Sequence, residues 1–160
     1  MYKFCILLVI CGLAACQSHH GQQGQVVHHV GAITSTDLLA EFPIFAKEYQ
    51  AYSPSVQELS AMKVLQGKTL LVLFGTWCHD SEREVPRLLK TIALAGLDNY
   101  QLKLVAVDFA KQEPSGLYLK HQLRHTPTFV MESKGLEVAR VVEVPMVTIA
   151  QDLAAQLSLR

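Results

Sequence analysis

The chain has 160 residues, half of them hydrophobic, which is enough for one domain with a substantial core and argues against disorder throughout. Lysine plus arginine and aspartate plus glutamate both number 14, so the formal net charge is zero. With no basic excess and no basic run, the composition argues against a nucleic-acid-binding protein.

The first fifteen residues form a separate unit. Met1–Lys3 is a short positive start, and the apolar run from Phe4 to Ala15 is too short to span a bilayer as a helix. This pattern predicts a secretory signal peptide in residues 1–15. Its end, Leu13-Ala14-Ala15-Cys16, resembles the bacterial lipoprotein signal, which implies cleavage before Cys16 and lipid on that residue. The alternative is an ordinary cleaved signal that a cysteine happens to follow.

Lipidation at Cys16 would leave a single free thiol. Cys5 and Cys11 leave with the signal, so Cys78 remains alone, in an oxidising compartment and with no partner for an internal disulfide. A lipid anchor predicts a protein held at a membrane surface without spanning it. Gln17 follows the cysteine in place of aspartate, which in enterobacteria-like lipoproteins implies the outer membrane, facing the periplasm of the cell envelope.

Residues 16–33 are predicted to be a flexible tether between the anchor and one folded domain, residues 34–160. The tether is polar and holds two pairs of histidines, His19-His20 and His28-His29.

Hydrophobic periodicity and turn residues predict the elements of this domain in chain order. A helix capped by Ser35 or Thr36 reaches Phe45 with a kink or break at Pro43, and a second helix opens at Pro54 and ends at Gly67. There follow a strand Thr69 to Gly75, a helix His79 to Ala95, a strand Leu102 to Phe109, a short helix Leu117 to Leu123, a hairpin of strands Thr128 to Met131 and Glu137 to Val144, and a helix Val147 to Leu157. Crossover helices join parallel strands and hairpins join antiparallel ones, so this order predicts an α/β fold with a mixed central β-sheet and helices on both faces.

The segment Phe74-Gly75-Thr76-Trp77-Cys78-His79-Asp80-Ser81 joins a predicted strand to a predicted helix. A cysteine there lies at a helix N-terminus, where unpaired N–H groups and the helix dipole favour the reactive thiolate. Ser81 occupies the position three residues on, where a redox dithiol carries its second cysteine. The segment therefore predicts thiol chemistry with one sulfur.

Three matches make residues 35–160 resemble the thioredoxin-like superfamily. Trp77-Cys78-His79-Asp80-Ser81 is similar to the W-C-x-x-C active-site turn, with serine in the second cysteine position. Pro86 falls at the kink proline of the active-site helix. Thr126-Pro127-Thr128 matches the loop whose proline has a cis peptide bond and faces the active cysteine.

This resemblance implies a thioredoxin-like fold in which Cys78 is the nucleophile. Thr126 and Pro127 would supply a backbone edge against which a substrate chain lies like a strand. Trp77 would shield one side of the sulfur, unless it packs as an ordinary core residue.

Four polar neighbours have open roles. Ser81 could donate a hydrogen bond to the thiolate. Alternatively it is an ordinary residue of the first helical turn, and both descriptions can hold together. His79, when protonated, would stabilise the thiolate, and Asp80 would oppose it while also suiting a first helical turn. His125 is a second candidate for local charge or proton transfer.

The chain departs from the family pattern at Ser81 and at Val72, where thioredoxins carry a buried aspartate six residues before the active cysteine. Both changes favour a monothiol mechanism. Cys78 would form mixed disulfides with cysteine-containing envelope proteins or small thiols, and an outside thiol would release them. The same cysteine would also be open to oxidation to sulfenic acid. We expect no cofactor and no dedicated metal site.

Two alternatives stay open. Beside thiol–disulfide exchange, the chain could instead be a binding module that has lost catalysis and holds partners near Pro127, or a copper-handling protein. In the second case Cys78, His79, His125 or the tether histidines would supply soft ligands, although their spacing is not a recognised ligand pattern.

Overall fold

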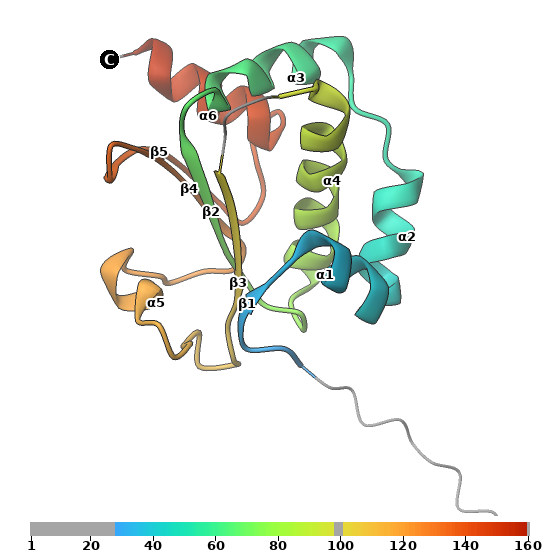
Figure 1. Cartoon of the computed structure of the whole chain (residues 1–160), viewed down its shortest axis with the longest axis vertical. Coiled ribbons are helices and arrows are strands. Elements are labelled where there is room, and N and C mark those ends of the chain that lie inside the picture. Colours follow the sequence, from blue (N-terminus) through green and yellow to red (C-terminus); the bar gives the residue numbers. More distant parts are fainter. Residues whose placement is uncertain (1–27, 98–100, 160) are drawn as a thin grey trace, which may run out of the picture.

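A computed structural model describes residues 28–97 and 101–159 (Figure 1). The predicted signal peptide, Cys16 and the tether up to residue 27 lie outside these residues. The strands are β1 Gly31–Ile33, β2 Thr69–Phe74, β3 Gln101–Ala106, β4 Thr128–Ser133 and β5 Leu136–Val142. The helices are α1 Ser35–Glu41, α2 Pro43–Ala51, α3 Val56–Ala61, the 3₁₀ turn η1 Met62–Leu65, α4 His79–Ala95, α5 Leu117–Lys120 and α6 Ile149–Ser158.

The strands form one mixed sheet in the order β1-β3-β2-β4-β5. The central strands β2 and β3 run parallel, and the other three neighbouring pairs are antiparallel. No helix in the described part of the chain is long and apolar enough to cross a membrane.

Helices cover the two faces of the sheet unequally (Figure 1). Alternate side chains of the strands, such as Val72 and Phe74, pack with α1, α2, η1, α4 and α6 in the main core. The intervening side chains, such as Leu71 and Leu73, form a smaller cluster with Leu117 of α5 and the following Leu123. The predicted α/β class is thus confirmed, and the architecture is a thioredoxin-like fold with one thinly covered face.

The helix starts differ slightly from the predicted ones. Thr34, not Ser35 or Thr36, caps α1, and its hydroxyl accepts a hydrogen bond of 3.0 Å from the N–H of Asp37. Pro43 breaks the predicted helix in two, because it opens α2 where its missing N–H costs nothing. Ser55 caps α3, which therefore begins two residues after Pro54.

Strand β1 corrects the predicted tether boundary. Residues 31–33 pair antiparallel with Leu104–Ala106 of β3, so the ordered domain begins before residue 34. Three residues, one of them glycine, are too few for hydrophobic periodicity to reveal a strand. Pairing with an edge of the sheet, rather than local preference, decides the structure here.

Candidate functional site

Cys78 lies where the central strand β2 passes into α4. It is the N-cap residue of α4, and its carbonyl accepts a hydrogen bond of 2.9 Å from the N–H of Glu82. Its own N–H donates to the carbonyl of Gly75 at 3.1 Å, which closes the turn. Cys78 is half-buried as a residue, so it is neither a core residue nor fully in solvent.

The sulfur of Cys78 contacts the loop before β4. Its Sγ donates a hydrogen bond of 3.0 Å to the carbonyl of Thr126, and the Thr126–Pro127 peptide bond is cis. Thr126 and Pro127 are both buried. The two segments singled out in the sequence therefore meet at the sulfur.

Three successive carbonyls of this loop accept hydrogen bonds inside the protein. The carbonyl of His125 accepts from the Thr128 hydroxyl at 2.7 Å, and that of Pro127 accepts from the N–H of Glu143 at 2.7 Å. The Thr126 carbonyl lies between them and accepts from Cys78. The backbone edge predicted for a substrate chain thus has its acceptors occupied while the thiol keeps its proton.

An aromatic stack holds Trp77 beside the cysteine. Its ring stacks on Phe109 with centroids 4.8 Å apart, and its Nε1–H donates to the carbonyl of Val107 at 3.1 Å. His28 meets the Phe109 ring edge-on at 4.8 Å, and the Lys111 ammonium lies 5.9 Å from the Trp77 ring centroid. Trp77 is half-buried and belongs to neither apolar cluster found among the described residues, so this stack, rather than core packing, holds it.

Gly75 permits the close approach of the Trp77 ring. A Cβ at residue 75 would lie 2.7 Å from Cε2 of the indole. Phe109, His28 and Lys111 were not among the predicted site residues, because Phe109 was assigned to a strand and His28 to the tether. A strand end followed by an exposed aromatic residue was the one available signal.

Ser81 is fully buried and supports the turn below the cysteine. Its Oγ accepts a hydrogen bond of 3.3 Å from the N–H of Gly75. None of the hydrogen bonds found in residues 28–97 and 101–159 joins Ser81 to the sulfur of Cys78. Val72 is likewise fully buried in β2, where its apolar side chain packs in the main core.

The other predicted polar residues face carboxylates or guanidinium groups. His79 is exposed, with Nδ1 3.7 Å from Glu82, and Asp80 pairs with Arg83 at 3.1 Å. His125 is also exposed, and its Nδ1 lies 3.3 Å from Glu143. Within the described residues none of these three groups forms a hydrogen bond with Cys78.

A copper site has no ligand set in the part of the chain that the structure describes. No group of three or more histidine, cysteine, aspartate or glutamate side chains there is arranged to hold a metal ion. His19 and His20 lie outside the described residues.

Comparisons with known proteins give the fold and no activity. No family model and no curated protein sequence matches the chain. Among solved structures, an HIV epitope scaffold has a TM-score of 0.62 at 14% identity, over 81% of this chain and 94% of its own. A protein of unknown function from Pseudomonas aeruginosa has a TM-score of 0.54 at 18% identity, over 79% and 82%. Mitochondrial thioredoxin 3 of Saccharomyces cerevisiae reaches only 0.41 at 16% identity, over 71% and 99%, too distant to support an argument.

Proposed function

We propose that this protein carries out thiol–disulfide exchange with Cys78 as its nucleophile. The observation that carries the proposal is the half-buried Cys78 at the N-cap of α4, whose sulfur is hydrogen-bonded to the Thr126 carbonyl beside the cis Thr126–Pro127 bond. The first-turn N–H groups of α4 have no intrahelical acceptors and offer partial positive charge to a sulfur anion.

The reaction is a displacement at sulfur. The Cys78 thiolate attacks one sulfur of a partner disulfide, a Cys78–partner S–S bond forms, and the partner's original S–S bond breaks. The displaced sulfur leaves as a thiolate and takes up one proton, equivalent to the proton that Cys78 gave up. Cys78 is oxidised in the mixed disulfide, and the leaving sulfur is reduced.

Release requires a second thiol from outside the chain. The position of a resolving cysteine holds Ser81, whose buried oxygen accepts from Gly75. A cysteine of the partner gives isomerisation, whereas a small or protein thiol gives reduction. The mixed disulfide is therefore the long-lived state of this protein.

Loss of the Cys78 thiol proton also frees an acceptor on the backbone edge formed by Thr126 and Pro127. In the mixed disulfide the sulfur has no proton to donate, so the Thr126 carbonyl becomes available to an N–H of the partner chain. Binding and chemistry are coupled through this one acceptor.

The cellular setting follows from the N-terminal sequence. We propose a signal peptide in residues 1–15, lipid on Cys16, and a protein facing the periplasm from the outer membrane. Its partners would be cysteine-containing envelope proteins or small thiols.

A stoichiometric reaction of the full chain with 5,5′-dithiobis(2-nitrobenzoate) tests the nucleophile. We expect the folded wild type to release one more equivalent of the coloured thiolate than Cys78→Ala does. Equal release by the two proteins would refute the proposal and leave the binding-module alternative.

A further inference from the structure

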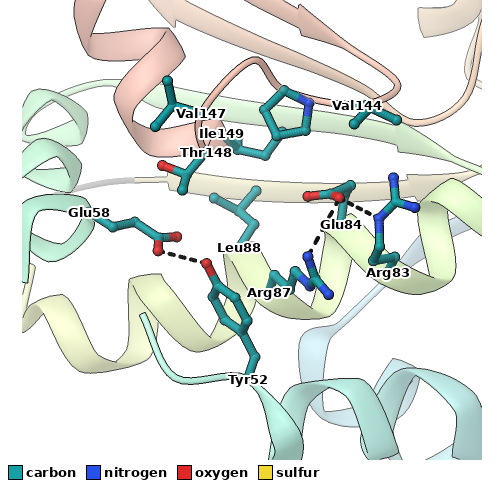
Figure 2. Close-up of a pocket in the computed structure, with 11 residues that line it drawn as sticks. Tyr52, Glu58, Arg83, Glu84, Arg87, Leu88, Val144, Val147, Thr148 and Ile149 are labelled. Atoms are coloured by element: carbon teal, nitrogen blue, oxygen red, sulfur yellow. Dashed lines mark hydrogen bonds and ion pairs between the residues drawn. The ribbon is translucent and has the colours of Figure 1, made fainter. Parts of the chain in front are cut away.

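A pocket of about 280 Å³ lies between α4 and the segment that leads into α6, and its lining also includes Tyr52 at the end of α2 and Glu58 of α3 (Figure 2). Its lining combines apolar side chains, Leu88, Val144, Val147 and Ile149, with polar ones, Tyr52, Glu58, Glu84 and Arg87. Its volume is just below the range of about 300–1,000 Å³ typical of ligand pockets, so an occupant must be small.

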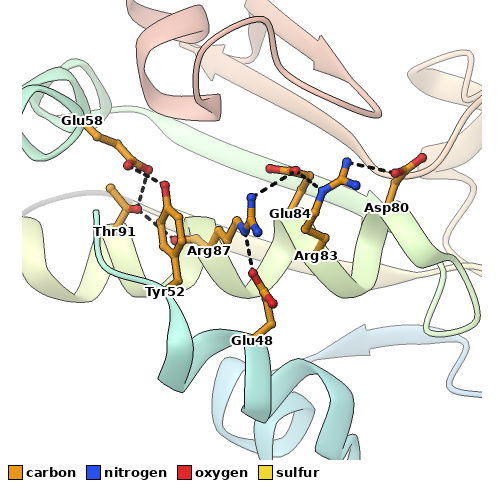
Figure 3. Close-up of polar contacts among 8 residues, drawn as sticks. All are labelled: Glu48, Tyr52, Glu58, Asp80, Arg83, Glu84, Arg87 and Thr91. Atoms are coloured by element: carbon orange, nitrogen blue, oxygen red, sulfur yellow. Dashed lines mark hydrogen bonds and ion pairs between the residues drawn. The ribbon is translucent and has the colours of Figure 1, made fainter. Parts of the chain in front are cut away.

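Glu58 is a buried carboxylate of this lining that forms no ion pair with a described residue. It is 4% exposed, and its two oxygens accept hydrogen bonds of 2.7 Å from the hydroxyls of Tyr52 and Thr91 (Figure 3). None of the ion pairs found among the described residues includes Glu58. Burial, followed by the hydrogen bond to Glu58, raises the pKa of Tyr52, so the phenol stays a neutral donor. Two neutral donors compensate a buried negative charge only in part.

Arg87 presents an unfilled guanidinium edge to the same pocket. Its Nε pairs with Glu48 at 2.6 Å, and its guanidinium carbon lies 5.1 Å from the centroid of the Tyr52 ring. Its Nη1 is 4.0 Å from Glu84, which is too long for a hydrogen bond (Figure 2).

The carboxylate of Glu84 already forms an ion pair with Arg83. Arg83 pairs with it at 2.6 Å, and this hydrogen bond is the main cause of the raised pKa of Arg83. The terminal nitrogens of Arg87 therefore have no hydrogen-bond acceptor among the described residues.

We propose that this pocket binds a small zwitterion, an α-amino acid with an apolar side chain. Its ammonium group pairs with Glu58, its carboxylate takes the free edge of Arg87, and its side chain lies against Leu88 and Ile149. The ammonium group then meets a carboxylate that has hydrogen-bond donors but no ion pair among the described residues. The ligand carboxylate meets terminal guanidinium nitrogens that have no hydrogen-bond acceptor there. The site is separate from the thiol, because Arg87 follows Cys78 by roughly 14 Å along α4.

Residue-resolved NMR titration of the full chain tests the site. L-Leucine, L-valine and L-methionine are the probes, with 4-methylpentanoate lacking the ammonium group and 3-methylbutylamine lacking the carboxylate. We expect saturable shifts of amide signals in residues 83–88 and 144–149 with an amino acid, and binding at least about tenfold weaker for both analogues.

Variants identify the charges responsible. Glu58→Gln should weaken amino-acid binding at least about tenfold, whereas Glu82→Gln, in the pocket-lining helix α4 but outside the pocket, should leave it unchanged. If Glu58→Gln fails to fold, Arg87→Lys is compared with the wild type instead and should also weaken amino-acid binding. This half-exposed side chain would keep its positive charge but lose the planar guanidinium group that binds a carboxylate. The proposal is overturned if the folded wild type shows no saturable shift with any of the three amino acids up to about 10 mM. It is also overturned if the folded variant, or the ammonium-free analogue, binds as well as the parent.

Discussion

The sulfur of Cys78 and the carbonyl oxygen of Thr126 lie 3.0 Å apart, although 48 residues separate them in the chain. This contact joins the start of α4 to the loop that enters β4. The thiol donates a hydrogen bond to the carbonyl of the buried residue Thr126. This hydrogen bond orders the site, and it is lost when the sulfur reacts as a thiolate.

The contact predicts a stability difference between two variants of Cys78. Cys78→Ala removes the donor and should lower the free energy of unfolding by about 0.5–1.5 kcal/mol, whereas Cys78→Ser keeps a hydroxyl donor and should lose less. Urea unfolding of both variants measures this difference. Equal losses would mean that the Thr126 carbonyl does not depend on this donor.

The stack of Trp77 on Phe109 predicts a change in the environment of the single tryptophan. Phe109→Ala should cost about 0.5–1.5 kcal/mol beyond the area it exposes, and it should increase acrylamide quenching of Trp77. Leu119→Ala, another exposed apolar side chain, is the matched control and should leave the quenching unchanged. Unchanged quenching in Phe109→Ala would show that the aromatic stack does not protect the indole.

Ser81 predicts a structural cost that is independent of redox chemistry. Ser81→Ala leaves the N–H of Gly75 without its acceptor in a buried turn, and the free energy of unfolding should fall by about 1–3 kcal/mol. Thermal or urea unfolding under reducing conditions measures it. A neutral substitution would imply that the hydroxyl contributes little to the turn.

Glu113 predicts a dependence of stability on pH. Burial alone would raise its pKa, but hydrogen bonds from Ser115 and from the N–H of Tyr118 outweigh it, and the pKa lies below its ordinary value of 4.5. Because the folded state holds the carboxylate more strongly than the unfolded state does, its contribution is complete above pH 4.5 and is lost as the pH falls through the folded pKa.

Glu113→Gln should therefore be less stable than wild type by about 1.5–3 kcal/mol at pH 7, and the gap should narrow below pH 4.5. Unfolding curves at several pH values between 7 and 3 measure the gap. A gap that stays constant over this range would show that the charge on Glu113 is not what stabilises the loop.

Local patterns in the sequence were enough to predict the elements that carry the sulfur. The predicted bounds of α4 are those observed, since its apolar spacing is regular and Gly96 ends it in a left-handed conformation. Strand β2 was predicted to within one residue because its apolar run is continuous.

The parts that were missed depend on contacts between distant segments. β1 forms only by pairing with β3, and β3 ends at Ala106, before Phe109, because the chain turns where Asp108 binds Gln112 and Lys111. The pocket lined by Tyr52, Glu58 and Arg87 could not be predicted, because these three residues come from separate segments of the chain. Each of them is an ordinary helix or turn residue when read alone.

Mass spectrometry of mixed disulfides tests the central claim most directly. The full chain carries Cys5→Ser, Cys11→Ser and Cys16→Ser in every sample, so that Cys78 is the single thiol of the reference protein, called wild type below. The reduced chain is mixed with a peptide disulfide, and the adduct on Cys78 is followed in this wild type, Cys78→Ala and Ser81→Cys. We expect an adduct on Cys78 that persists in wild type and is absent from Cys78→Ala. In Ser81→Cys a second sulfur one helical turn away should displace the peptide as a free thiol and leave an internal disulfide. If the wild type formed no adduct on Cys78, Cys78 would not be the nucleophile. If the adduct persisted as long in Ser81→Cys as in the wild type, the absence of an internal second cysteine would not be what keeps the mixed disulfide.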